Sequence, residues 1–268
     1  MNLDTKKFPR TQHIEGSRLQ HGDGDMKVIP WSDLKRRPLV VSEKLDGANV
    51  GISFSDQGDL LLQSRGHYLR GGPREKQFDI FKQLANDNVD VLFDALCSRY
   101  ILYGEWMYAC HSIYYDDLPC YFHAFDVYDK ERDAFLSTAR RDGLLYDVYK
   151  TFITFAPVLA YQRTFNDIND LLALLGNCGY FTNERTSNYL ITAHDSGFLR
   201  KDGENNEIQE ALSCRDWSPL MEGLYVKLED DERVLGRCKY VRSSFTNTIA
   251  GNEIHWFDRQ IVQNKLRN

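Results

Sequence analysis

The amino-acid sequence predicts an α+β fold in which antiparallel strands form hairpins and helices lie between the strand regions. Apolar residues alternate in strand fashion over residues 48–54, and strand character returns over residues 223–241. Between these regions the period lengthens to the three- and four-residue spacing of amphipathic helices. Strands that follow one another directly indicate antiparallel hairpins and argue against a doubly wound parallel sheet.

The predicted strands are short runs bounded by turn residues. Residues 38–43 form an apolar run, and residues 48–54 place Val50, Ile52 and Phe54 on one face. A Ser-Asp-Gln-Gly turn then leads into the next strand. Further strands are predicted over residues 59–64, 100–106, 121–128, 223–229 and 234–241.

Helical spacing predicts several helices and leaves one long segment unassigned. Phe78, Phe81, Leu84 and Ala85 repeat at helical intervals. The polar residues 180–219 show no clear period and receive no assignment. The other predicted helices are residues 89–100, residues 137–152 with Ser137 as N-cap, and residues 166–175 ended by Gly176.

The composition is that of a folded protein without membrane-spanning segments. Of the 268 residues, 42% are hydrophobic and 13% aromatic, which allows a substantial core. No apolar run approaches the roughly 18 residues of a membrane span, and the polar residues 1–10 do not resemble a signal peptide. The six cysteines form no Cys-x-x-Cys pair, so we expect reduced thiols in the cytoplasm rather than a structural zinc site.

The net charge of −6 is unfavourable for binding nucleic acid, because phosphate neutralisation normally supplies most of the affinity. Any such binding must rest on local basic patches. A solvated turn and a binding surface are equally compatible with residues 35–37. The candidate patches are residues 35–37, the cluster of Arg65, Arg70, Arg74 and Lys76, and the group of Arg237, Lys239 and Arg242.

Two polar groups within apolar surroundings are candidates for chemistry. Residues 43–49, Glu-Lys-Leu-Asp-Gly-Ala-Asn, place Lys44 directly after an apolar run and before a glycine turn. Such a lysine can be a covalent nucleophile when burial or neighbouring cations lower its pKa, although an exposed hairpin lysine remains an alternative. Glu105 lies in an apolar strand and needs a partner, for which a ribose hydroxyl, a metal ion or an arginine would serve.

Six polar segments at strand ends carry a family resemblance by their order along the chain. Over residues 41–242 they resemble the covalent nucleotidyltransferase superfamily of ATP-dependent ligases and messenger-RNA capping enzymes. Within it the chain is most similar to the phage RNA ligase 2 class, in which Lys-x-(Asp/His)-Gly-x-Asn is typical, as at Lys44 to Asn49. DNA ligases usually have arginine at the position of Asn49. The segments are residues 43–49, 63–66, 103–106, 122–127, 221–227 and 236–242.

The resemblance implies the nucleotidyltransferase fold, an ATP-grasp-like ligase adenylation fold in which antiparallel sheets flank a nucleotide cleft and helices are peripheral. Residues 1–268 are then a single adenylyltransferase domain without a separate C-terminal nucleic-acid-binding domain. Residues 254–268 are expected to form a packed helix or strap. A protein partner or residues 8–19 would supply extra RNA affinity, although structural roles are expected for His13 and Arg18.

The resemblance also implies catalytic roles. Lys44 takes AMP through a phosphoramidate bond, Glu222 helps to hold the catalytic metal ion, and Lys239 contacts the α-phosphate. Positive charge from Arg237, Lys239 and the metal ion is expected to lower the pKa of Lys44, so that the neutral amine can attack. Arg237 stands where the family often has lysine, and it keeps the charge but not the geometry.

Further residues match positions that bind the nucleotide in this family. Arg65 meets the nucleotide or the RNA end, Glu105 binds the ribose, and Phe125 stacks on adenine. The remaining residues expected at the nucleotide are Glu43, Asp46, Gly47, Asn49, Lys227 and Arg237.

The implied activity is that of an ATP-dependent RNA ligase using Mg²⁺ or Mn²⁺. Lys44 attacks ATP and releases pyrophosphate, the AMP moves to an RNA 5′-phosphate, and a 3′-hydroxyl displaces AMP to close the strand. The alternatives are a DNA nick-sealing ligase, a guanylate-transferring cap enzyme and a catalytically silent nucleotide-binding module. Asn49 and the lack of a C-terminal domain weigh against the first two, and the presence of Lys44 with its carboxylates weighs against the third.

Overall fold

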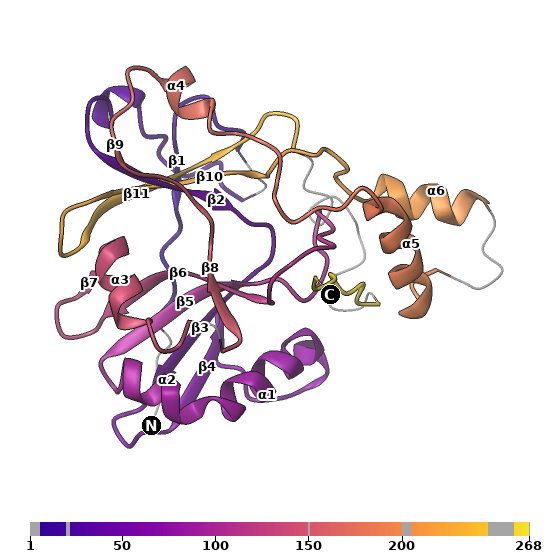
Figure 1. The fold of residues 1–268 in the computed structure, drawn as a ribbon, viewed down its shortest axis with the longest axis horizontal. Coiled ribbons are helices and arrows are strands. Elements are labelled where there is room, and N and C mark those ends of the chain that lie inside the picture. The colour runs from indigo at the N-terminus through magenta and orange to yellow at the C-terminus, as the bar shows by residue number, and fades with distance from the viewer. Residues whose placement is uncertain (1–5, 20–21, 150, 200–204, 246–259, 268) are drawn as a thin grey trace.

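The computed structural model describes residues 6–19, 22–149, 151–199, 205–245 and 260–267. In this part of the chain two β-sheets lie one above the other in the view of Figure 1, with helices around them. The predicted α+β class with antiparallel sheets is confirmed.

The first sheet has the strand order β1-β11-β10-β2-β9. Its neighbours are antiparallel except for the edge strand β1, which runs parallel to β11. The strands of this sheet are β1 (Gln12–His13), β2 (Leu39–Lys44), β9 (Val158–Arg163), β10 (Gly223–Glu229) and β11 (Val234–Val241).

The second sheet has the order β4-β3-β5-β6-β7, and β8 lies parallel beside β6. Its other neighbours are antiparallel. The strands of this sheet are β3 (Ala48–Phe54), β4 (Leu60–Ser64), β5 (Tyr100–Trp106), β6 (Phe122–Asp129), β7 (Ala134–Phe135) and β8 (Ile153–Phe155).

The chain crosses from one sheet to the other directly after Lys44. Strand β2 ends at Lys44 in the first sheet, and β3 begins at Ala48 in the second. The three residues 45–47 therefore span the space between the sheets. Lys44 is therefore the last strand residue before the crossing.

One hydrophobic core joins the two sheets. Val41 and Leu224 from the first sheet and Ile52 and Leu102 from the second are fully buried in the same cluster. Burial of each such side chain contributes about 1.5–3 kcal/mol. The sheets are therefore held together by apolar packing as well as by the crossing.

Helices α1 (Asp79–Asp87) and α2 (Val89–Leu96) lie against the second sheet in Figure 1 and bury Phe81 and Leu92 against the core. The prediction that the second of these helices reaches residue 100 is wrong. Cys97 has a φ of 45°, in the left-handed region, and this residue ends the helix ahead of strand β5.

The helix predicted over residues 137–152 is much shorter, because α3 spans only Thr138–Leu144. Ser137 is its N-cap as predicted, and its side chain accepts a hydrogen bond from the Arg140 amide. Residues 145–148 and 151–152 are turns that lead to β8, whose pairing with β6 requires extended backbone. Likewise the helix predicted over 166–175 is reduced to α4 (Ile168–Leu172).

Two helices lie in the segment that the sequence left unassigned, α5 (Arg185–Asp195) and α6 (Asn205–Ser213). They bury Tyr189 and Ala211 in a small separate core. Their high polar content hid the helical period. Short 3₁₀ helices also occur at Trp31–Asp33 and Pro73–Phe78.

Residues 260–267 form an extended strap, while the earlier part of the predicted tail lies outside the described residues. Asn264 is fully buried: its Nδ2 donates to the Met107 carbonyl at 2.7 Å, and its Oδ1 accepts from the Tyr115 amide at 2.9 Å. The strap thus fastens the loop that follows β5. Among the helices of the described residues, none has both the length and the apolar character needed to cross a membrane.

Gly223 permits the close packing of β10 on β11, because a Cβ there would lie 1.9 Å from the Tyr240 carbonyl oxygen. We expect Gly223→Ala to lower the free energy of unfolding by about 3 kcal/mol or more, since the backbone would have to separate. Gly236→Ala is the matched control, because its Cβ would meet open space on the neighbouring strand. Urea unfolding of both variants tests this, and equal stabilities would contradict it.

Candidate functional site

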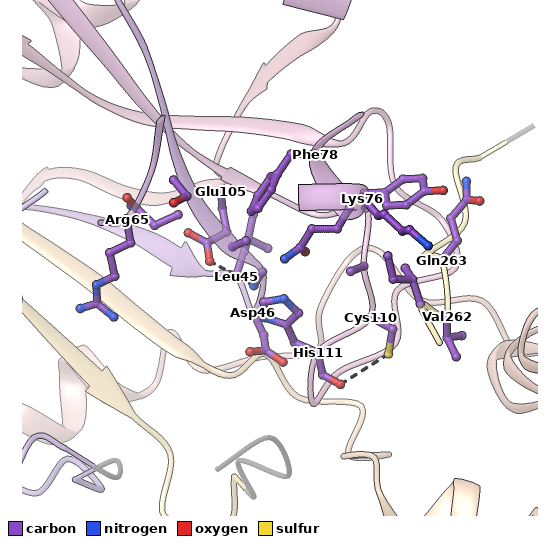
Figure 2. Close-up of a pocket in the computed structure, with 18 of the residues that line it drawn as sticks. Leu45, Asp46, Arg65, Lys76, Phe78, Glu105, Cys110, His111, Val262 and Gln263 are labelled. Carbon is purple, nitrogen blue, oxygen red and sulfur yellow. Dashed lines mark hydrogen bonds between the residues drawn. The ribbon is translucent and has the colours of Figure 1, made fainter. Parts of the chain in front are cut away.

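A cavity of about 1630 Å³ lies between the two sheets and is lined from both. The first sheet contributes Lys44 and Lys239, and the second contributes Asn49 and Glu105. Its volume exceeds the roughly 300–1,000 Å³ of sites for small molecules, so it has room for a larger ligand. Figure 2 shows how the lining residues of this cavity surround the crossing at residues 45–47.

A partly buried ion pair joins Lys44 to Glu222 in the lining of the cavity. Strand β10 pairs with β2 in the register Gly223↔Lys44, which brings the preceding Glu222 beside the lysine. The Lys44 Nζ lies 2.8 Å from Glu222 Oε2. The lysine side chain is 24% exposed and the glutamate side chain 1%, and both side chains line the cavity.

The pKa of Lys44 lies above its ordinary value. Burial opposes its charge and lowers the pKa, but Glu222, Glu105 and Asp46 together outweigh that effect. The predicted lowering of this pKa included a metal ion beside Glu222, and the bare carboxylates at Lys44 act in the opposite direction, as expected of an unneutralised Glu222.

Asp46 fixes the crossing by hydrogen bonds to the loop after β5. Its Oδ2 accepts from the amides of Ser112 at 2.7 Å and Ile113 at 2.8 Å, and its own amide donates to the Tyr115 hydroxyl at 3.0 Å. Burial nevertheless raises the pKa of Asp46. This carboxylate therefore stabilises the backbone next to Lys44.

Gly47 allows the crossing to approach β5 closely. A Cβ at this position would lie 2.7 Å from the Trp106 carbonyl oxygen and 2.8 Å from the Met107 sulfur. The Gly47 amide donates to Glu105 Oε1 at 3.1 Å. Burial, with a further contribution from Glu222, raises the pKa of Glu105 to about 7 against the opposing charge of Lys44.

Lys239 reaches the cavity from β11 and is paired with Asp23, whose Oδ2 lies 2.7 Å from the lysine Nζ. Burial lowers the pKa of Lys239; Asp23 opposes that shift and the nearby Lys44 adds to it. Lys44 and Lys239 are thus each matched by a different carboxylate.

Three further predicted residues line the cavity from other directions. Phe125 on β6 packs edge-on against Phe8, with ring centroids 5.1 Å apart. Arg65 is exposed after β4, and in the view of Figure 2 it lies on the opposite side of Asp46 from Gln263. Glu43, the third of these residues, is 4% exposed on β2.

A family model described as RNA ligase matches residues 37–241, which is more than half of the chain. This chain belongs to the RNA ligase family. No curated protein sequence matches it.

Solved structures of a Naegleria gruberi RNA ligase are similar to this member of the RNA ligase family. A variant with ATP and Mn shares 16% identity and a TM-score of 0.48, covering 80% of this chain and 52% of that one. An apo variant gives the same identity and coverage with a TM-score of 0.49, and a variant with AMP and Mn gives 0.48. The chain therefore spans about half the length of these structures.

In this RNA ligase family member, Lys227 and Arg237 are not brought to the cavity. The Lys227 Nζ lies 3.3 Å from Asp126 and 3.5 Å from Glu229, with 1% of its side chain exposed. Arg237 lies 3.6 Å from Asp126 and covers the Phe135 ring at 3.7 Å. Lys227 and Arg237 are paired with each other across β10 and β11, four residues along β10 from Gly223, which is paired with Lys44. At this distance both side chains lie beside Asp126 of β6 instead of in the cavity lining.

Sequence reasoning missed the contacts of the N-terminal segment with the cavity. His13 is fully buried and binds Asp23, and Asp23 was not among the candidates. Arg18 donates to the Ser243 carbonyl at 2.9 Å, in line with the structural role expected for it. No spacing signal marks these partners, because Lys239 is more than two hundred residues away from Asp23.

Glu43 makes the stability of the protein depend on pH. Burial raises its pKa to about 7, although a hydrogen bond with Cys178 acts in the opposite direction. Its Oε1 has no hydrogen-bond partner in the described residues. The folded state then binds more protons than the unfolded state between about pH 4.5 and pH 7, so stability falls as pH rises through this window. We expect Glu43→Gln to remove this loss. Between pH 5 and pH 8 the free energy of unfolding of the variant should rise by up to about 3 kcal/mol relative to that of the wild type.

Urea unfolding at both pH values measures the difference, with Asp90→Asn, an exposed carboxylate, as the control. Parallel pH dependences of the wild type and Glu43→Gln would show that Glu43 is not the titrating group.

Proposed function

We propose that this chain is an ATP-dependent RNA ligase in which Lys44 carries AMP covalently before the AMP moves to an RNA 5′-phosphate. The observation that carries the proposal is Lys44 itself: a partly exposed lysine that lines the cavity directly before the crossing between two sheets. Membership of the RNA ligase family supports the substrate class.

A nucleotide fits the polar groups of the cavity wall. Asn49 Oδ1 is buried and has no partner among the described residues, and an unmet buried acceptor costs about 1–3 kcal/mol. A bound ligand with a donor would meet this need. We assign Phe125 to stacking on adenine, Glu105 to the ribose and Lys239 to the α-phosphate.

We assign the other cavity residues to supporting contacts with the nucleotide. Glu43, Asp46 and Gly47 shape the pocket around Lys44, and Arg65 at the exposed rim meets the nucleotide or the RNA end. Lys227 and Arg237 are left in their contacts with Asp126.

Glu222 is the residue that we assign to a divalent metal ion, either Mg²⁺ or Mn²⁺. The described residues contain no group of three or more His, Cys, Asp or Glu side chains that could hold a metal ion alone. This fits Mg²⁺, which protein sites commonly bind through one or two carboxylates together with substrate phosphates. Such an ion would offset negative charge that develops on the phosphates.

The first step requires Lys44 to lose a proton to solvent water and then attack, because a Glu222 carboxylate that binds the metal ion is not available as a base. Glu222 Oε2, 2.8 Å from the amine, holds Lys44 in position. The Lys44 nitrogen forms a bond to the α-phosphorus of ATP, and the bond to the bridging oxygen of the β-phosphate breaks. Pyrophosphate leaves with that electron pair, and Lys239 stabilises the charge on the α-phosphate oxygens.

The later steps return Lys44 to its starting state. An oxygen of the RNA 5′-phosphate attacks the same phosphorus and breaks the nitrogen–phosphorus bond, and Lys44 regains a proton. The RNA 3′-hydroxyl then attacks the activated 5′-phosphate, and AMP departs as the strand closes.

Residues 1–268 form, in this proposal, one adenylyltransferase domain with the nucleotidyltransferase fold of the phage RNA ligase 2 class. The core shared by the two sheets supports a single unit. The net charge of −6 supports a protein partner that supplies extra affinity for RNA.

Replacing the nucleophile tests the proposal directly. Lys44→Ala should form no AMP adduct on incubation with ATP and Mg²⁺ or Mn²⁺, because the attacking amine is gone, while the wild type and the exposed-site control Lys35→Ala gain the mass of one AMP. Intact-mass spectrometry reads the adduct, and circular dichroism checks the fold. An adduct on Lys44→Ala would rule out this lysine.

Sealing assays separate the alternative activities. Wild-type protein is offered nicked duplexes in which the strand to be joined is RNA or DNA, with ATP or GTP. We expect joining of the RNA strand with ATP. Joining confined to DNA would favour a nick-sealing DNA ligase, and an adduct only with GTP would favour a cap enzyme.

A further inference from the structure

We propose that Asp23 is a positioning residue for Lys239, so that the N-terminal segment completes the phosphate-binding part of the cavity. This inference rests on the proposed function, because it concerns how the lysine is held for adenylation.

The N-terminal segment first fixes the backbone of β11. Strand β1 runs parallel to β11 with His13 opposite Lys239, and the Ile14 amide donates to the Lys239 carbonyl at 3.0 Å. Beyond it, the Ser17 hydroxyl accepts from the Val241 amide at 2.9 Å. The position of the lysine backbone therefore depends on residues 12–17.

The same segment then folds back and brings a carboxylate to the lysine side chain. The Ile29 amide donates to the His13 carbonyl at 2.8 Å, which closes the loop that contains Asp23. Asp23 Oδ2 lies 2.7 Å from Lys239 Nζ and 2.8 Å from His13 Nε2. Arg10 approaches the other oxygen, Oδ1, at 3.3 Å.

The Asp23 carboxylate defines the donors of this network. An ionised carboxylate only accepts, so His13 Nε2 carries the hydrogen that it donates to Asp23. In a neutral ring the opposite nitrogen, Nδ1, then accepts from the Ser17 hydroxyl at 2.7 Å. Burial lowers the pKa of His13, in agreement with a neutral ring. His13 therefore holds the Asp23 carboxylate in the orientation in which it contacts Lys239.

Burial and charge give this contact its importance. The side chains of Lys239 and Asp23 are each 12% exposed, and the His13 side chain is fully buried, so water competes little for the ion pair. Lys239 also lies in the repulsive field of Lys44. Asp23 thus holds a flexible side chain in one place and balances its charge next to a second lysine.

The test compares Asp23→Asn and Asp23→Glu with Asp25→Asn. Asp25 is the matched control, because it lies in the same loop and pairs with Arg10, but its side chain is 72% exposed. Single-turnover adenylation is measured over a range of ATP concentrations. We expect Asp23→Asn to lower the maximal rate by about 10- to 100-fold with a smaller change in KM for ATP, since the lysine acts on developing charge. Asp23→Glu should recover part of the rate, and Asp25→Asn should match the wild type.

A double-mutant cycle distinguishes positioning from general stability. In a Lys239→Met background, where the lysine is already absent, Asp23→Asn should change the residual rate by less than about 2-fold. Thermal unfolding of each variant checks that the protein is folded. An undiminished effect of Asp23→Asn in that background, or a wild-type rate for Asp23→Asn alone, would overturn the inference while leaving the proposed function intact. Absence of any adduct on the wild type would overturn both.

Discussion

Lys44 and the buried Glu222 share an ion pair at the point where the chain leaves one sheet and enters the other. Removing either partner of such a pair leaves an uncompensated charge, at a typical cost of about 3–5 kcal/mol. The surrounding structure keeps the two side chains together. The β2–β10 register aligns them, and the hydrogen bonds of Asp46 and the absence of a side chain at Gly47 hold the crossing in place.

The polar face between the sheets divides into an open zone and a closed zone. The open zone contains Lys44 and Lys239 and borders the cavity. In the closed zone, Asp126 accepts from the Tyr225 hydroxyl at 2.6 Å and lies beside Lys227 and Arg237. Charged groups in the closed zone satisfy one another across the two sheets. The sheets are therefore joined by polar contacts next to a cavity that Lys44 and Lys239 line.

Local patterns predicted the strands well, because alternation reports directly on a half-buried surface: residues 48–54 form β3 with the predicted bounds. The helix at 137–152 was overextended, since periodicity does not reveal that Ile153 pairs with β6. In the site, strand alternation correctly placed Lys239 on the face that lines the cavity. Alternation does not show how far along the strand the cavity extends, so the prediction that Arg237 reaches the nucleotide site was wrong. The contact of Asp23 with Lys239 was unpredictable, because it depends on a parallel pairing of distant segments.

The strap at residues 260–267 has a consequence for the order in which the protein folds. Asn264 bonds to Met107, 157 residues earlier, and so secures the loop that also holds Asp46. A chain emerging from the ribosome is synthesised from its N-terminus, so residues 260–267 become available after the strands of both sheets. Both sheets can therefore assemble while this wall of the cavity is still loose. The site matures only when the strap has been synthesised and has docked.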